Sequence, residues 1–116
     1  MTTDSCLFCR IASRQLPSQI VEEDADAMAF ADIHPQAPTH LLVVPKTHLT
    51  SAAELSPETA PLAARVLLMA TRLAERLGLA KAGYRLVINT GPHGGQTVDH
   101  LHVHLLGGRP MRWPPG

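Results

Sequence analysis

One heptapeptide constrains this chain more than any other feature: residues 100–106 read His-Leu-His-Val-His-Leu-Leu. Successive side chains of a β-strand point to opposite faces of the sheet. The alternation therefore predicts a strand in which three imidazoles share one face while aliphatic side chains on the other face enter a core. Imidazoles are poor core material, but each ring can act near neutral pH as a nucleophile, a proton donor or a metal ligand. The plain alternative is a half-exposed strand whose polar face is rich in histidine.

The bulk properties fit one globular domain over residues 1–116, since 45% of the residues are hydrophobic and 17% are charged. Ten basic and ten acidic residues give a net charge of zero, which argues against a broad nucleic-acid-binding surface but allows a small phosphate pocket. No apolar run is long enough to span a membrane, and residues 1–5 lack the features of a signal peptide. Two nearby cysteines do not make a disulfide framework. We therefore expect a cytoplasmic protein without membrane or nucleic-acid partners.

Hydrophobic periodicity predicts mostly strands, with one substantial helix between them. The helix is expected between Ser56 and Leu77, where apolar residues recur at steps of three and four and arginines occupy another side. Pro61 leaves the start of this helix open. A shorter helix is predicted over residues 5–15, and strands over residues 20–23, 27–31, 40–44, 84–89 and 100–106. This order favours an α+β domain with an antiparallel sheet.

Several separated motifs carry a family resemblance. The histidine segment is preceded by residues 89–99, Asn-Thr-Gly-Pro-His-Gly-Gly-Gln-Thr-Val-Asp, and followed by Gly-Gly-Arg. Upstream, residues 32–40 read Asp-Ile-His-Pro-Gln-Ala-Pro-Thr-His, and the tail ends in Met-Arg-Trp-Pro-Pro-Gly. From about Cys6 to Gly116, the chain resembles the histidine triad (HIT) superfamily, and its tail resembles the histidine triad nucleotide-binding (HINT) branch. The resemblance implies a HIT-like fold: a five-stranded antiparallel sheet with one long and one short helix, dimerising into a larger sheet.

The resemblance also implies catalytic roles. His102 would attack the α-phosphate of a nucleotide and form a nucleotidyl-histidine intermediate. About three-quarters of unperturbed imidazoles are unprotonated at pH 7, so a lone pair is present for this attack. His104 would hydrogen-bond the α-phosphate, and His100 and His40 would complete the histidine cluster. Thr97 stands where HINT proteins commonly have serine, so it keeps a hydroxyl for the leaving group.

A nucleotide site follows from the same resemblance. Asp32 would accept hydrogen bonds from the ribose hydroxyls, and Ile33 would cover the purine. By themselves, Asp32 reads as a turn residue and the glycine pair of residues 94–95 as a plain turn. Phe8 belongs either to the core or to the base pocket. The expected nucleotide-binding residues are Asp32, Ile33, Asn89, Gly95, Gln96, Thr97, His102 and His104.

Cys6 and Cys9 form a Cys-x-x-Cys pair that suits one side of a tetrahedral zinc site. The resemblance to some bacterial HIT proteins supplies two further ligands, His48 and His100, for a structural zinc. Two reduced thiols without metal are an equal alternative. A redox pair fits less well, because no thioredoxin-like pattern surrounds it.

The predicted function is hydrolysis of purine nucleoside phosphoramidates, including those of AMP and GMP, to the nucleoside monophosphate and an amine by a homodimeric enzyme. Catalysis of this kind requires no cofactor. Two alternatives stay open: a dinucleoside polyphosphate hydrolase, and a purine-nucleotide-binding or scaffolding protein whose hydrolysis is incidental.

Overall fold

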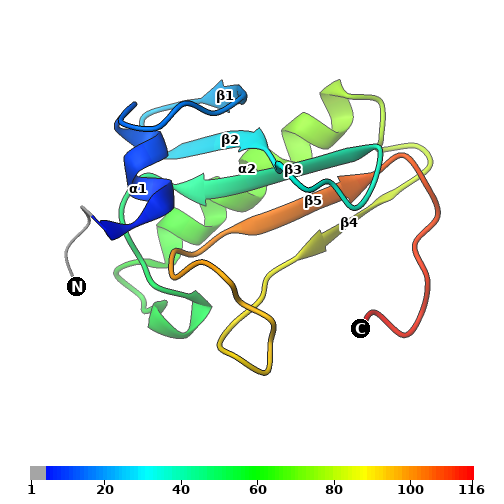
Figure 1. The fold of residues 1–116 in the computed structure, drawn as a ribbon. Coiled ribbons are helices and arrows are strands. Elements are labelled where there is room, and N and C mark those ends of the chain that lie inside the picture. Colours follow the sequence, from blue (N-terminus) through cyan, green and yellow to red (C-terminus); the bar gives the residue numbers. More distant parts are fainter. Residues whose placement is uncertain (1–4) are drawn as a thin grey trace.

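A computed structural model describes residues 5–116, which form an antiparallel five-stranded sheet with helices on its two faces (Figure 1). The strand order is β1-β2-β3-β5-β4, so β1 and β4 lie at the edges. The predicted α+β fold is confirmed. In chain order the elements are α1 (Leu7–Ala12), β1 (Ile20–Glu23), β2 (Ala27–Ala31), β3 (Thr39–Pro45), the 3₁₀ turn η2 (Ala52–Glu54), α2 (Ala60–Arg76), β4 (Tyr84–Val87) and β5 (Val103–Gly107).

The two faces of the sheet carry separate cores, because alternate residues of each strand point to opposite sides. One face packs against α2 through Ala27, Ala29, Leu41, Val43, Val103 and Leu105. The other face packs against α1, whose Phe8 and Ile11 meet Met28, Phe30, Leu42 and Val44. Figure 1 shows α2 behind the sheet and α1 in front of it. The even-numbered residues of β3 and β5, including His40 and His104, therefore share the α1 face.

Helix α2 follows the predicted periodicity, and its buried residues are Val66, Met69, Ala70, Leu73 and Ala74. It begins at Ala60, and Pro61 is accepted because it stands in the first turn, where its missing N–H leaves no bond unmade. Leu77, expected on the core side, is instead 46% exposed beyond the end of the helix. Leu79 is buried in the turn that follows. Within residues 5–116, no helix combines the length and the apolar character needed to cross a membrane.

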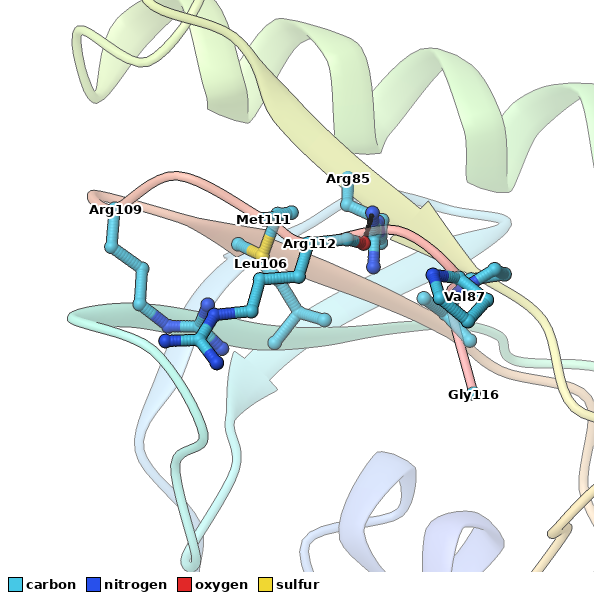
Figure 2. Close-up of a pocket in the computed structure, with 9 residues that line it drawn as sticks. Arg85, Val87, Leu106, Arg109, Met111, Arg112 and Gly116 are labelled. Atoms are coloured by element: carbon cyan, nitrogen blue, oxygen red, sulfur yellow. Dashed lines mark hydrogen bonds between the residues drawn. The ribbon is translucent and has the colours of Figure 1, made fainter.

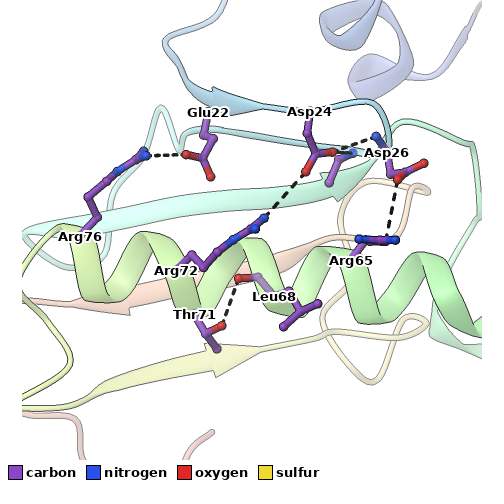
Figure 3. Close-up of polar contacts among 9 residues, drawn as sticks. Glu22, Asp24, Asp26, Arg65, Leu68, Thr71, Arg72 and Arg76 are labelled. Carbon is purple, nitrogen blue, oxygen red and sulfur yellow. Dashed lines mark hydrogen bonds and ion pairs between the residues drawn. The ribbon is translucent and has the colours of Figure 1, made fainter.

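The arginine side of α2 pairs with the β1–β2 hairpin, as Figure 3 shows. The three pairs are Arg65 with Asp26, Arg72 with Asp24 and Arg76 with Glu22, at 3.9, 3.9 and 2.6 Å between nitrogen and oxygen. Exposed pairs of this kind each contribute less than about 1 kcal/mol. In each pair, one arginine of α2 lies opposite one acidic residue of the hairpin, so the charges of the two elements balance.

The histidine strand begins later than predicted, at Val103 rather than at His100. Val43 pairs with Val103, and two residues further along β3 stands Pro45, which has no N–H to extend the ladder. The backbone N–H of Leu101 donates instead to the carbonyl of Leu49, at 2.7 Å. His102 therefore sits at the entrance to β5, and His100 lies in a bend behind it.

Candidate active site

The side chain of His102 is oriented by the backbone two residues before it. Its Nδ1 lies 2.7 Å from the carbonyl oxygen of His100, so Nδ1 carries the proton and donates it. The lone pair is then on Nε2, which has no hydrogen-bond partner within residues 5–116. The ring is only 4% exposed and packs edge-on against Phe8, with 5.1 Å between the ring centroids. This arrangement presents an unprotonated nitrogen with a fixed direction.

A relay of hydrogen bonds sets the opposite tautomer at His104. The backbone N–H of Gln36 donates to Nδ1 of His40 at 3.0 Å, so the proton of His40 is on Nε2. That Nε2 lies 2.9 Å from Nδ1 of His104 and 3.4 Å from a carboxylate oxygen of Asp32. His104 therefore accepts at Nδ1 and carries its own proton on Nε2. The two neighbouring rings thus offer one lone pair, at His102, and one N–H donor, at His104.

Burial favours the neutral form of His104 and His40. Desolvation, and then the neighbouring His102 and His40, lower the pKa of His104 from 6.5 to about 4. Burial also lowers the pKa of His40, with Asp32 acting in the opposite direction. Neutral rings keep the tautomers of the relay unchanged through the physiological pH range.

The low pKa of His104 makes stability depend on pH. Between about pH 6.5 and pH 4 the unfolded chain binds the proton and the folded chain does not, so the free energy of unfolding should fall as pH falls. For a half-buried ring we expect a loss of about 1–2 kcal/mol from pH 7 to pH 5. Urea denaturation at the two pH values measures this loss, and His104→Gln should reduce it whereas His93→Gln, at an exposed loop position, should not. An equal loss in wild type and His104→Gln would contradict the assignment.

A cavity of about 460 Å³ opens over His102 and His104. Its walls come from α1, β2, the segment after α1 and the turn before β3, and they are mostly apolar. Phe8, Phe30, Leu42 and Val98 line it, together with three sequence-predicted residues, Asp32, Ile33 and Thr97. Ile33 is 85% exposed at the rim. The shape and lining suit a flat apolar ring system with a polar group near Asp32.

The loop before the histidines is held by its own side chains. Asn89 donates from Nδ2 to the carbonyl of Gly94 at 2.6 Å. Gln96 accepts from the N–H of Gly91 and donates to the carbonyls of Thr50 and Val98. The side chains of Asn89 and Gln96 therefore shape the loop, and of the predicted loop residues Thr97 is the one whose side chain faces the cavity.

The glycines of this loop are needed for its shape. A Cβ at Gly94 would meet the carbonyl oxygen of Thr90 at 2.2 Å, closer than any side chain tolerates. Gly95 has a φ of +78°, in the left-handed region that favours glycine. Its N–H donates to the carbonyl of Pro92 at 3.1 Å.

A second cluster lies beneath α1. Cys6, Cys9, His48 and His100 place one sulfur or nitrogen each within 4.8 Å of one another. Nδ1 of His100 lies 3.2 Å from the sulfur of Cys6 and 3.5 Å from that of Cys9, and Nδ1 of His48 lies 3.4 Å from the sulfur of Cys9. Nδ1 of His100 is an acceptor, because its Nε2 donates to the carbonyl of Pro45 at 2.8 Å.

These donors fit zinc in type and spacing. In a tetrahedral site with ordinary bond lengths, sulfur and nitrogen ligands stand about 3.5 Å apart. Two thiols and two imidazoles complete four ligands, which is the pattern of a closed structural site. Without metal, burial and the contact with Cys6 raise the pKa of Cys9 to about 12. The candidate metal ligands predicted from the sequence thus come together in one place.

Three groups that orient the histidines were not foreseen, and all are backbone atoms. The N–H of Gln36 orients His40, the carbonyl of Pro45 orients His100, and the carbonyl of His100 orients His102. Phe8 packs in the core on the α1 face, contacts the ring of His102 and lines the cavity over the histidines, so the core and base-pocket interpretations of this residue both apply.

The sheet, the histidine cluster and the cavity beside it together define a class of protein. Comparison with known proteins identifies that class. The HIT domain model matches residues 13–111, and the chain belongs to this family. It is 44% identical over 108 residues to the purine nucleoside phosphoramidase of Escherichia coli strain K12, covering 93% of this chain and 91% of that protein.

Two solved structures extend the comparison. A HIT family hydrolase from Legionella pneumophila superposes with a TM-score of 0.95 at 50% identity, covering 97% of this chain and all of that one. A zinc-bound histidine triad family protein from Mycobacterium smegmatis superposes with a TM-score of 0.77 at 34% identity, covering 93% of this chain and 78% of that one. The relatives therefore include proteins named as hydrolases and one that holds zinc.

Proposed function

We propose that this protein hydrolyses purine nucleoside phosphoramidates at the α-phosphate, releasing a nucleoside monophosphate and an amine. The observation that carries the proposal is the fixed tautomer of His102, whose Nε2 lone pair lies at an apolar cavity large enough for a nucleoside. The similar protein from Escherichia coli, named as a purine nucleoside phosphoramidase, supports this substrate class over others.

The reaction proceeds in two displacements. Nε2 of His102 attacks the α-phosphorus, the phosphorus–nitrogen bond breaks, and the amine leaves after taking up a proton. Water then attacks the nucleotidyl-histidine, the bond from phosphorus to Nε2 breaks, and the nucleoside monophosphate is released. The N–H on Nε2 of His104 donates to a phosphoryl oxygen, where negative charge grows. Thr97, at the cavity wall, offers its hydroxyl to the leaving group.

The remainder of the cavity binds the nucleoside. Asp32 accepts from the ribose hydroxyls, and Ile33 and Phe8 cover the purine. Asn89, Gly95 and Gln96 act by holding the loop that carries Thr97. No cofactor takes part in the two displacements.

The test is turnover of adenosine 5′-phosphoramidate compared with that of a diadenosine polyphosphate. We expect a clear preference for the phosphoramidate, and guanosine phosphoramidate to be accepted as well. Preference for the polyphosphate would favour the neighbouring hydrolase activity. Binding of AMP without turnover of either compound would favour a nucleotide-binding or scaffolding protein.

The cysteine–histidine cluster binds a structural zinc. Support comes from the four converging ligand atoms and from the zinc-bound relative. The metal would join α1 to His48, in the segment after β3, and to His100, two residues before the nucleophile. Cys6 and Cys9 are free thiols, which suits a reducing compartment such as the cytoplasm.

The protein forms a homodimer through the edge strand β4 and neighbouring α2. Within residues 5–116, β4 pairs with β5 alone, and its other edge has unpaired backbone groups. Leu68 on α2, Ile88 after β4 and Trp113 in the tail are 52%, 45% and 82% exposed. Pairing of two β4 edges would extend the sheet and cover apolar side chains of this region.

Leu68→Glu should convert the dimer into a monomer, because a buried unpaired carboxylate at the interface costs several kcal/mol. Light scattering after size exclusion measures the mass. Leu77→Glu is the matched control, since Leu77 is 46% exposed and lies nine residues further along, just beyond the end of α2. A dimer that survives Leu68→Glu and dissociates in Leu77→Glu would place the interface elsewhere.

A further inference from the structure

The N–H on the His40 ring has two acceptors. Its nitrogen, Nε2, lies 2.9 Å from Nδ1 of His104 and 3.4 Å from a carboxylate oxygen of Asp32. The other ring nitrogen of His40 offers no second proton, because Nδ1 accepts the backbone N–H of Gln36 at 3.0 Å. One N–H of a neutral ring is therefore shared between an uncharged acceptor, His104, and a charged one, Asp32.

Asp32 and His40 are held beside each other where β2 ends and β3 begins. The backbone N–H of Asp32 donates to the carbonyl of His40 at 3.1 Å. Oδ1 of Asp32 accepts the backbone N–H of His34 at 2.8 Å, and Oδ2 is the oxygen that faces the His40 ring. The side chains of His40 and Asp32 are only 5% and 18% exposed. Hydrogen bonds among such shielded groups are stronger than in water, so each one affects its neighbours.

The three side chains differ in their access to a substrate. Asp32 and His104 line the cavity in which the nucleoside is proposed to bind, whereas His40 is buried and does not belong to the lining. His40 therefore acts through its two neighbours and is a positioning residue. One neighbour is the proposed acceptor of the ribose hydroxyls, and the other is the proposed donor to a phosphoryl oxygen.

The negative charge of Asp32 acts on both rings. Burial lowers the pKa of His40, and Asp32 raises it. At His104, burial and then the neighbouring histidines lower the pKa to about 4, and Asp32 again acts in the opposite direction. A change in the surroundings of the Asp32 carboxylate therefore changes the electrostatic potential at His104 as well as at His40.

We propose that His40 couples ribose binding to the phosphate donor: hydroxyls that donate to Asp32 weaken its attraction for the His40 N–H, and the bond from His40 to His104 becomes stronger. An imidazole that accepts a stronger hydrogen bond at Nδ1 is a better donor at Nε2, because successive hydrogen bonds polarise one another. The ribose then stabilises the transition state as well as the bound substrate. This coupling rests on the phosphoramidase function proposed above, and it makes nucleotides with intact ribose hydroxyls the substrates that turn over fastest.

The kinetic test compares adenosine 5′-phosphoramidate with its 2′,3′-dideoxy analogue. Hydroxyls that assist only binding would change KM and leave kcat unaltered. We expect the analogue to have a higher KM and also a kcat about fivefold lower in the wild-type protein. His40→Leu, which has no donor, should bring the ratio of the two kcat values close to one. The difference in KM should remain in this variant, because Asp32 still binds the hydroxyls.

Two further variants make the comparison specific. His40→Gln places an amide N–H near the position of Nε2 and should restore a kcat ratio above one. His34→Ala removes an exposed imidazole close to Asp32, keeps the backbone N–H that Asp32 accepts, and should keep the wild-type ratio. A kcat ratio of one in the wild type, or a ratio that is unchanged in His40→Leu, overturns the coupling while leaving phosphoramidate hydrolysis intact.

Proton NMR of the wild-type protein measures the same coupling without turnover. The ring N–H of His40 should resonate further downfield with AMP bound than with 2′,3′-dideoxyadenosine 5′-monophosphate bound, because a stronger hydrogen bond deshields its proton. This difference supports the coupling even if neither phosphoramidate is hydrolysed, in which case the proposed function alone fails. Identical resonances with the two nucleotides, or no binding of AMP, overturn the coupling.

Discussion

His102→Ala should reduce turnover of adenosine phosphoramidate by at least about 10³-fold, because a methyl group cannot form the covalent intermediate. The measurement is steady-state kinetics, together with mass spectrometry of protein quenched during turnover. Wild-type protein should carry one added nucleotidyl group, and the variant none. AMP should still bind the variant with nearly unchanged affinity, since Asp32, Ile33 and Phe8, which line the cavity, are the residues proposed to bind the nucleoside.

The control is His93→Ala, which removes an exposed imidazole of the loop before β5 and should leave turnover within about twofold of wild type. His104→Ala should retain the nucleotidyl intermediate and form it more slowly, because it loses a donor and not the nucleophile. If the nucleotidyl intermediate forms in His102→Ala and is absent in His104→Ala, then His104 is the nucleophile and His102 is the donor, opposite to the proposal.

Removal of the proposed zinc should destabilise the protein strongly. Purified without added metal or chelator, the protein should contain one zinc per chain by elemental analysis. Chelation should lower Tm by at least about 10 °C, because ligands contributed from three distant parts of the chain lose their common centre. AMP affinity should fall as well, since Phe8 lies between Cys6 and Cys9 and lines the cavity over His102 and His104, where the nucleoside is proposed to bind.

Cys9→Ser provides the genetic equivalent of chelation. Its Tm should match that of chelated wild type and should no longer respond to chelator. Ser13→Ala, at the exposed C-terminal end of the same helix, should keep both the zinc and the Tm. If the zinc-free wild-type protein keeps its Tm, then the two thiols and two imidazoles of the cluster need no metal.

Local patterns in the sequence predicted the architecture well. Alternation located β5, and three- and four-residue spacing located α2, because both patterns follow from which side chains a strand or helix can bury. The errors lie at the ends of elements. β5 lost its first three residues since Pro45 cannot continue the ladder, and Leu77 became exposed since the helix ends before it. Where such an element begins or ends depends on contacts with residues that are distant in the sequence.

The candidate site was also predicted only in part. Histidines and cysteines were found from side-chain chemistry and motif spacing. The groups that set their tautomers were not, because they are backbone atoms: the N–H of Gln36 and the carbonyls of Pro45 and His100. Any residue could supply those atoms, so no residue type marks them. The contact between β4 and the tail, in which Arg85 donates to the carbonyl of Arg112 (Figure 2), was also missed, because it forms only when the tail folds back along β4.

The strand order has a consequence for how the chain acquires its site during synthesis. β1, β2 and β3 can pair as they emerge, but β4 has no neighbour until β5, the last strand made, inserts between β3 and β4. The hydrogen bond between the side chains of Cys6 and His100 likewise joins residues that are 94 positions apart in the sequence. Contacts of such long range form late, after the entropy of closing the chain has been overcome. Because the strand that completes the sheet also has the proposed nucleophile, His102, at its entrance, chains that stall before β5 is added have neither a complete sheet nor this histidine.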